Sequence, residues 1–135
     1  MEKASLTSHN LTKGRKDMRP HENLEAWTKS IDLVVDIYKA TDRFPKEERY
    51  GLTSQLRRAA VSVPANLAEG AGRYSAKEFA HFVSNAQGSA SELKTELILA
   101  YRLGYLSETL FSQLVANLDR IGRLITGLSK HIRAN

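Results

Sequence analysis

The 135-residue chain contains no cysteine, so neither a disulfide framework nor a thiolate metal site is available to it. No apolar run approaches the roughly 18 residues of a membrane-spanning helix. The first twenty residues, MEKASLTSHNLTKGRKDMRP, also lack the apolar core of a secretory signal. These absences predict a cytoplasmic protein that does not enter a membrane. The length predicts one domain, large enough to bury a core without cross-links.

Basic residues exceed acidic ones. The formal net charge is +5 and the isoelectric point is near 9.6, which favours an anionic partner such as nucleic acid. Part of this excess lies in the first seventeen residues, where four lysines and arginines stand against two acids. That segment is too polar to fold alone. The expected organisation is a disordered basic tail over residues 1–19 and a folded domain over residues 20–135.

Apolar residues beyond the tail recur at alternating spacings of three and four, which is typical of helices in a bundle. The helices are expected near residues 23–41, 46–69, 75–104 and 107–132. Because the connections are short, neighbouring helices should run antiparallel. The predicted fold is all-α, an antiparallel up-down four-helix bundle. The stripe expected to face the core in the first helix is Leu24, Trp27, Ile31, Val34 and Tyr38, widened by Val35 and Ile37.

The other three helices have longer stripes and recognisable ends. Ser75 to Glu78 form a capping box, and Ser107 is the expected N-cap of the last helix. Gly70 and Gly72 suit a left-handed end of the second helix, and Gly104 ends the third. The expected core stripes are Leu52, Leu56, Ala59, Val63 and Leu67; Phe79, Val83, Ala86, Ala90, Leu93, Leu97 and Ala100; and Phe111, Leu114, Leu118, Ile121, Ile125, Leu128 and Ile132.

The least ordinary stretch is RRAAVSVPANLAEGAGRYSAKEF, over residues 57–79. Pro64 removes a backbone donor inside the second helix, so this helix should be kinked. Small residues around Pro64 and around Gly88 predict a close approach of the second and third helices. Since a glycine inside a helix costs about 1 kcal/mol relative to alanine, close packing is the expected reason for Gly88.

Polar residues follow the same two helices at helical spacing, which predicts a hydrogen-bond and ion-pair network between them. Arg58 is expected to be internal and close to a carboxylate. An alternative is that Glu69, Glu92 and Glu96 act as paired carboxylates in acid–base catalysis. No histidine or other nucleophile converges with them, so we do not expect an enzyme. The predicted structural network is Arg58, Ser62, Asn66, Glu69, Ser89 and Glu92.

Cations on the last helix form the main candidate nucleic-acid surface. At 100° per residue they share a sector of about 100°, away from the apolar stripe. Arg57 and the Arg73-Tyr74 pair are further candidates, the latter because a cation beside an aromatic ring suits base stacking. The alternative is an ordinary solvated face whose cations suit the helix C-terminus. The cations of the sector are Arg120, Arg123, Lys130 and His131.

Metal and cofactor sites are not expected. Glu78 and His81 match once the Glu-x-x-His spacing that di-iron bundles use on facing helices, but no second copy is present. Phosphate-loop and dinucleotide fingerprints are absent as well, because the EGAGR segment follows a helix and not a strand.

The segment QLRRAAVSVPANLAEGAGRYSAKEFAHFVSNAQGSASELKTEL closely resembles the bacterial four-helix-bundle family named for proteins encoded in 23S ribosomal-RNA intervening sequences. Flanking matches, ENLEAWTKSIDLVVDIYKAT, FPKEERYGL and LAYRLGYLS, extend the resemblance over about residues 20–132. The resemblance implies a homopentameric ring without enzymatic activity. A related branch is the accessory protein of diversity-generating retroelements, a basic pentameric barrel that binds reverse transcriptase and nucleic acid. Nothing in these residues assigns the chain to that branch.

Together these observations predict a non-enzymatic homo-oligomer, expected to be a pentamer, that binds RNA, DNA or a nucleic-acid-processing protein. The alternative is an assembly that contacts only proteins and has no nucleic-acid role.

Overall fold

The computed structural model describes residues 20–134, and the predicted tail over residues 1–19 lies outside them. The described residues form four α-helices and no strand. The helices are α2 (Glu25–Thr41), α3 (Leu52–Ala71), α4 (Ala76–Arg102) and α5 (Glu108–Ala134). Short 3-10 turns, η3 (Pro20–Asn23) and η4 (Lys46–Glu48), precede α2 and α3. The predicted all-α four-helix fold is therefore confirmed.

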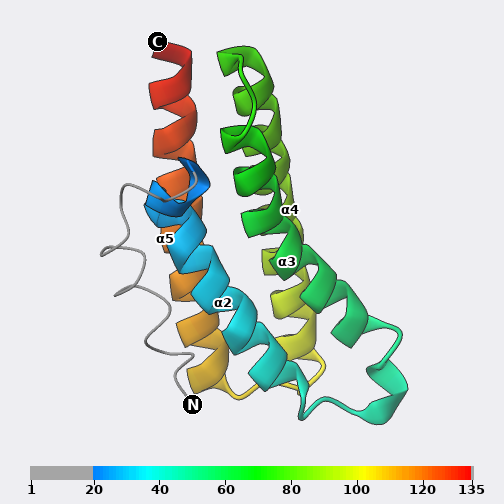
Figure 1. The fold of residues 1–135 in the computed structure, drawn as a ribbon. Helices are drawn as coiled ribbons and strands as arrows, with labels where there is room; N and C mark the ends of the chain where they lie inside the picture. The colour runs from blue at the N-terminus through cyan, green and yellow to red at the C-terminus, as the bar shows by residue number, and fades with distance from the viewer. Residues whose placement is uncertain (1–19, 135) are drawn as a thin grey trace, which may run out of the picture.

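The chain descends along α2, rises along α3, descends along α4 and rises along α5 (Figure 1). The helices differ in length: α4 and α5 have 27 residues each, whereas α2 has 17. In Figure 1, α2 accordingly crosses only the lower part of the bundle. None of the helices in residues 20–134 is long and apolar enough to cross a bilayer.

The core lies where three of the four predicted stripes place it. All of the expected positions of α3 are buried, and so are those of α4 and α5 except Phe79, Phe111 and Leu128, which are partly buried against the core. Burial of these side chains is the main stabilising term, about 25 cal/mol per Å² of apolar surface removed from water.

The stripe predicted for the first helix is confirmed at Ile37 and, partly buried against the core, at Trp27 and Val34, but it is wrong at Val35 and Tyr38. The buried face of α2 carries Ala26, Leu33 and Ile37, whereas Val35 and Tyr38 are exposed. Trp27 is partly buried and packs against the core, as expected. The true face is filled partly by small residues, because α2 packs closely on its neighbours, and a search for large apolar residues selects a face turned by about one residue.

The helix ends follow the predicted caps. Ser75 Oγ accepts the backbone N–H of Glu78 at 3.0 Å, and Ser107 Oγ accepts that of Leu110 at 3.1 Å. Gly104 has φ +85°, a left-handed conformation that follows the end of α4. Each side-chain cap satisfies one N–H that the helix itself leaves unpaired.

The close approach of α3 and α4 depends on Gly70 and not on Gly88. A Cβ atom on Gly70 would lie 2.7 Å from Cβ of Phe82, whereas one on Gly88 would meet nothing within 4 Å. The explanation of Gly88 by close packing within the bundle is therefore wrong. The expected left-handed Gly72 is also wrong, since its φ is −85°. Pro64 is buried inside a continuous α3, and its kink stays a prediction.

Candidate nucleic-acid interface

The four predicted cations of α5 are all exposed. Arg120 donates to Oε2 of Glu25 at 3.2 Å, so part of its charge is neutralised by α2. Within residues 20–134, no carboxylate lies at ion-pair distance from Arg123 or Lys130. Arg123 and Lys130 are therefore the cations of the row with the most charge left for an external anion.

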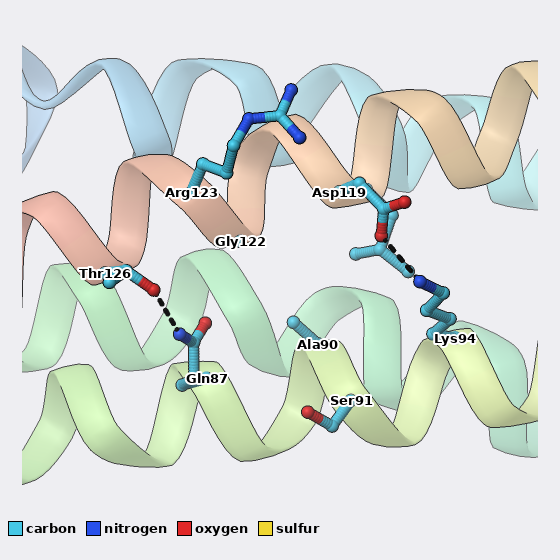
Figure 2. A pocket seen from close by; sticks show the side chains of 9 residues that line it. Gln87, Ala90, Ser91, Lys94, Asp119, Gly122, Arg123 and Thr126 are labelled. Carbon is cyan, nitrogen blue, oxygen red and sulfur yellow. Dashed lines mark hydrogen bonds and ion pairs between the residues drawn. The ribbon is translucent and has the colours of Figure 1, made fainter.

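A shallow groove of about 480 Å³ runs between α4 and α5 beside this row (Figure 2). Lys94 pairs with Asp119 across it at 2.9 Å, and Gln87 Nε2 donates to Thr126 Oγ1 at 2.8 Å. Figure 2 shows Arg123 at its edge, pointing away from α4. Lys94 thus neutralises Asp119, which lines the same groove as Arg123, and this leaves the field of Arg123 less compensated.

Arg57 joins α2 to α3. Its Nε donates to Thr41 Oγ1 at 2.8 Å, and its Nη2 contacts Asp42 Oδ1 at 3.1 Å and the carbonyl of Tyr38 at 3.3 Å. The guanidinium also lies 4.4 Å from the ring centroid of Tyr38. These contacts explain Arg57 structurally, and most of its donors are occupied.

The Arg73-Tyr74 pair is not arranged as a stacking unit. Arg73 is ion-paired with Glu69 and lies 3.9 Å from Glu78, with its guanidinium 4.9 Å from the ring centroid of Phe82. Tyr74 is fully exposed beside it. Arg73 therefore links the end of α3 to the start of α4, and the carboxylates of Glu69 and Glu78 neutralise most of its charge.

The predicted network divides into separate parts. Ser62 and Ser89 hydroxyls lie 2.8 Å apart and link α3 to α4, and Asn66 Nδ2 donates to Ser62 Oγ at 2.9 Å. Glu69 instead pairs with Arg73, near the end of α3. Glu69 thus pairs at the junction of α3 and α4, whereas Glu92 and Glu96 lie further along α4.

Arg58, Glu92 and Glu96 form the remaining part. Arg58 is exposed, so its predicted internal position is wrong. Glu96 is only 5% exposed, and its Oε1 has no hydrogen-bond partner among the described residues. The pKa of Glu96 is raised from 4.5 to about 7, first by burial and then by the neighbouring Glu92 carboxyl, and the charge of Arg58 opposes both. Arg58 thus lies close enough to a carboxyl to influence it, as predicted.

Sequence reasoning missed a second hollow, of about 510 Å³, on the α2–α3 side of the bundle. Tyr38, Arg49, Tyr50 and Arg58 line it. The Arg49-Tyr50 dipeptide was the available signal, the same cation–aromatic pairing that singled out residues 73 and 74. It was not recognised because both residues lie within a segment expected to be regular helix, whereas α3 begins only at Leu52.

Two comparisons relate this architecture to known proteins. The family model described as "23S rRNA-intervening sequence protein" matches residues 22–127. A crystal structure of a protein of unknown function from the S23 ribosomal protein family of Bacteroides thetaiotaomicron VPI-5482 superposes with a TM-score of 0.73. The two sequences are 22% identical, and the match covers 78% of this chain and 95% of the other. That likeness shows the fold alone. No curated protein matches the chain.

Proposed function

Because the chain belongs to the 23S rRNA-intervening sequence protein family, we propose that it is a non-enzymatic, homo-oligomeric scaffold that binds nucleic acid, or a partner that processes nucleic acid, through the exposed cations of α5. The resemblance to this family implies no enzymatic activity. Glu96 is buried and Glu69 is ion-paired with Arg73, so neither offers a free carboxylate as an acid–base partner for Glu92.

The observation that carries the proposal is the uncompensated charge of Arg123 and Lys130. Both side chains are exposed on the same side of α5, and no carboxylate of residues 20–134 pairs with them. The nearby Asp119 is already neutralised by Lys94. A row of this kind attracts phosphates, since each neutralised phosphate releases counterions.

Assembly would multiply the effect of a short row. One copy presents few free cations, whereas five copies in a ring would present the same row five times and bind one polymer with avidity. Exposed apolar side chains support assembly, because water-exposed residues of this kind gain most from burial against a second copy. They include Val35, Val61, Ile98, Leu99 and Leu103.

Binding to labelled RNA and DNA at two salt concentrations tests the proposal. Affinity should fall steeply with salt. The double variant Arg123→Gln, Lys130→Gln should make the slope of log K against log salt less steep by roughly 1.5. A matched double variant, Lys77→Gln with Arg102→Gln, removes the same charge from exposed positions of α4. If both double variants lose affinity equally, net charge and not the α5 row controls binding.

The alternative is an assembly that contacts only proteins. The exposed apolar side chains at the end of α4, Leu99 and Leu103 among them, favour it. Light scattering after size exclusion should give a mass near five times 15.1 kDa in either case. If the assembled protein binds almost no nucleic acid at low salt, the protein-only alternative is selected. If the protein is a monomer, no avidity from repeated copies is available to either function.

A further inference from the structure

The hollow between the end of α2 and the start of α3 is strongly basic. Among the nine residues that line it, three are arginines and none is acidic. Hydroxyl groups complete the polar part of the lining. Its volume of about 510 Å³ falls in the range of small-molecule and nucleotide sites. The lining is Tyr38, Arg49, Tyr50, Thr53, Ser54, Arg57, Arg58, Val61 and Ser62.

Two tyrosine rings lie in the same hollow. Tyr50 is 89% exposed, and the guanidinium carbon of Arg49 lies 5.8 Å from its ring centroid. Tyr38 is 42% exposed and has the Arg57 guanidinium at 4.4 Å from its ring centroid. An aromatic ring this exposed gains little from the folded core and has its faces free to pack against a ligand.

The turn that presents Tyr50 is fixed despite its exposure. Glu48 Oε1 accepts the backbone N–H of Leu52 at 3.0 Å, and its Oε2 accepts the hydroxyl of Tyr105 at 2.9 Å. Both bonds lower the pKa of Glu48, the Leu52 bond more strongly, so Glu48 stays ionised and the turn stays closed at neutral pH. The N–H of Gly51 also donates to the carbonyl of Glu48 at 3.0 Å. A ring held on a closed turn loses less conformational entropy when it binds.

The three arginines of the hollow differ in whether their guanidinium groups are free to bind a ligand. Arg57 is held by Thr41 and Asp42, and it serves mainly to place the Tyr38 ring. Within residues 20–134, no hydrogen bond or ion pair involves the guanidinium group of Arg49 or Arg58, although the charge of Arg58 lowers the pKa of Glu96. The lining of the hollow therefore holds two open guanidinium groups together with the exposed Tyr50 ring.

We propose that this hollow binds single-stranded nucleic acid, with an unstacked base lying on the Tyr50 ring and the adjoining phosphates held by Arg49 and Arg58. The proposal rests on the proposed nucleic-acid function and names its substrate class. A base can stack on an aromatic ring only when the face of the base is free, and the bases of a duplex are already stacked on one another. Because every base has a π-face, stacking on the Tyr50 ring is tolerant of sequence.

The test measures binding of the full-length protein to fluorescently labelled single-stranded RNA, single-stranded DNA and duplex DNA, each of about eight nucleotides per strand, a length typical of single-strand sites. Tyr50→Leu should weaken single-strand binding by about 5- to 150-fold, and Tyr50→Phe should restore it, because stacking needs the ring and not the hydroxyl. Arg49→Gln and Arg58→Gln should each reduce the salt slope by about 0.7. Tyr74→Leu, at the other fully exposed tyrosine, is the matched control.

Each outcome decides between specific explanations. If the wild type binds single strands at about 50 mM salt and Tyr50→Leu binds equally well, this inference is overturned and the proposed function stands. If the wild type binds none of the three nucleic acids at that salt, this inference fails together with direct nucleic-acid binding by the α5 cations. If Tyr74→Leu weakens binding in place of Tyr50→Leu, stacking occurs at Arg73-Tyr74 and not in this hollow. If Tyr50→Leu lowers the mass of the assembly, the hollow is a contact between copies, and the inference is overturned as well.

Discussion

Replacing Glu96 by glutamine should make the protein more stable at alkaline pH and leave it nearly unchanged at acidic pH. The carboxyl of Glu96 is buried with one oxygen unpaired, and its pKa is raised from 4.5 to about 7. The groups that face it are Glu92 on its own helix and Arg58 on α3. Glutamine keeps the shape of a protonated carboxyl and cannot ionise.

The sign and size follow from linkage between protonation and folding. The folded state holds the proton more tightly than the unfolded chain, so stability contributed by protonated Glu96 is complete below about pH 4.5 and declines as pH rises toward 7. One pKa unit corresponds to about 1.4 kcal/mol, so the rise from 4.5 to about 7 sets a ceiling of about 3–4 kcal/mol on the loss above pH 7. Local rearrangement of Arg58 toward the carboxylate would reduce this figure.

Urea denaturation of wild type and Glu96→Gln at about pH 5 and about pH 8, at one protein concentration, measures the effect. The variant should gain about 1–3 kcal/mol relative to the wild type between the two pH values. Glu108→Gln, at an exposed carboxyl of α5, is the control and should show no such gain. Equal pH dependence in wild type and Glu96→Gln would refute the reasoning, because it would mean that the carboxyl ionises without cost in the folded state.

Four further predictions concern stability. Gly70→Ala should destabilise the protein by about 1–2 kcal/mol in chemical denaturation, because overpacking against Phe82 outweighs the gain in helix propensity; a stabilised variant would show that the helices separate freely. Gly88→Ala should instead stabilise an isolated chain by about 1 kcal/mol, and a loss would show that another copy packs on that face. Gly104→Ala should lower thermal stability by about 1 kcal/mol through its positive φ. Arg57→Met should cost about 1–2 kcal/mol in the same thermal assay, since it removes the hydrogen bond to the Thr41 hydroxyl oxygen and the ion pair with Asp42, and an unchanged melting temperature would count against its anchoring role.

The predictability of the helices depended on the size of their core residues. In α3, α4 and α5 the core face carries leucine, isoleucine and valine at regular spacing, so periodicity located it. In α2 small residues such as Ala26 and Ser30 share the core face, while the larger Val35 and Tyr38 face outward. Hydrophobicity alone cannot tell a small buried residue from a small exposed one, and the predicted face was wrong for that reason.

The candidate site was less predictable, because its electrostatics depend on which charges meet. The sequence correctly indicated an exposed row on α5, but it could not show that Arg120 meets Glu25, which lies 95 positions away. Nor could it show that Arg57 is held by Asp42. Long-range pairing of this kind follows from the relative placement of helices, and residue spacing along one helix carries no information about it.

The amino-acid sequence by itself determined the four helices, most of their ends and three of their four buried faces. These features arise from interactions over one to two helical turns, which the spacing of residues along the chain records. Only the tertiary structure decided which arginines remain available, that Glu96 is buried with an unpaired oxygen, and that Tyr38 and Tyr50 lie in one basic hollow. Those features require side chains from different helices to meet, and the distance between them is set by packing and not by their separation in sequence.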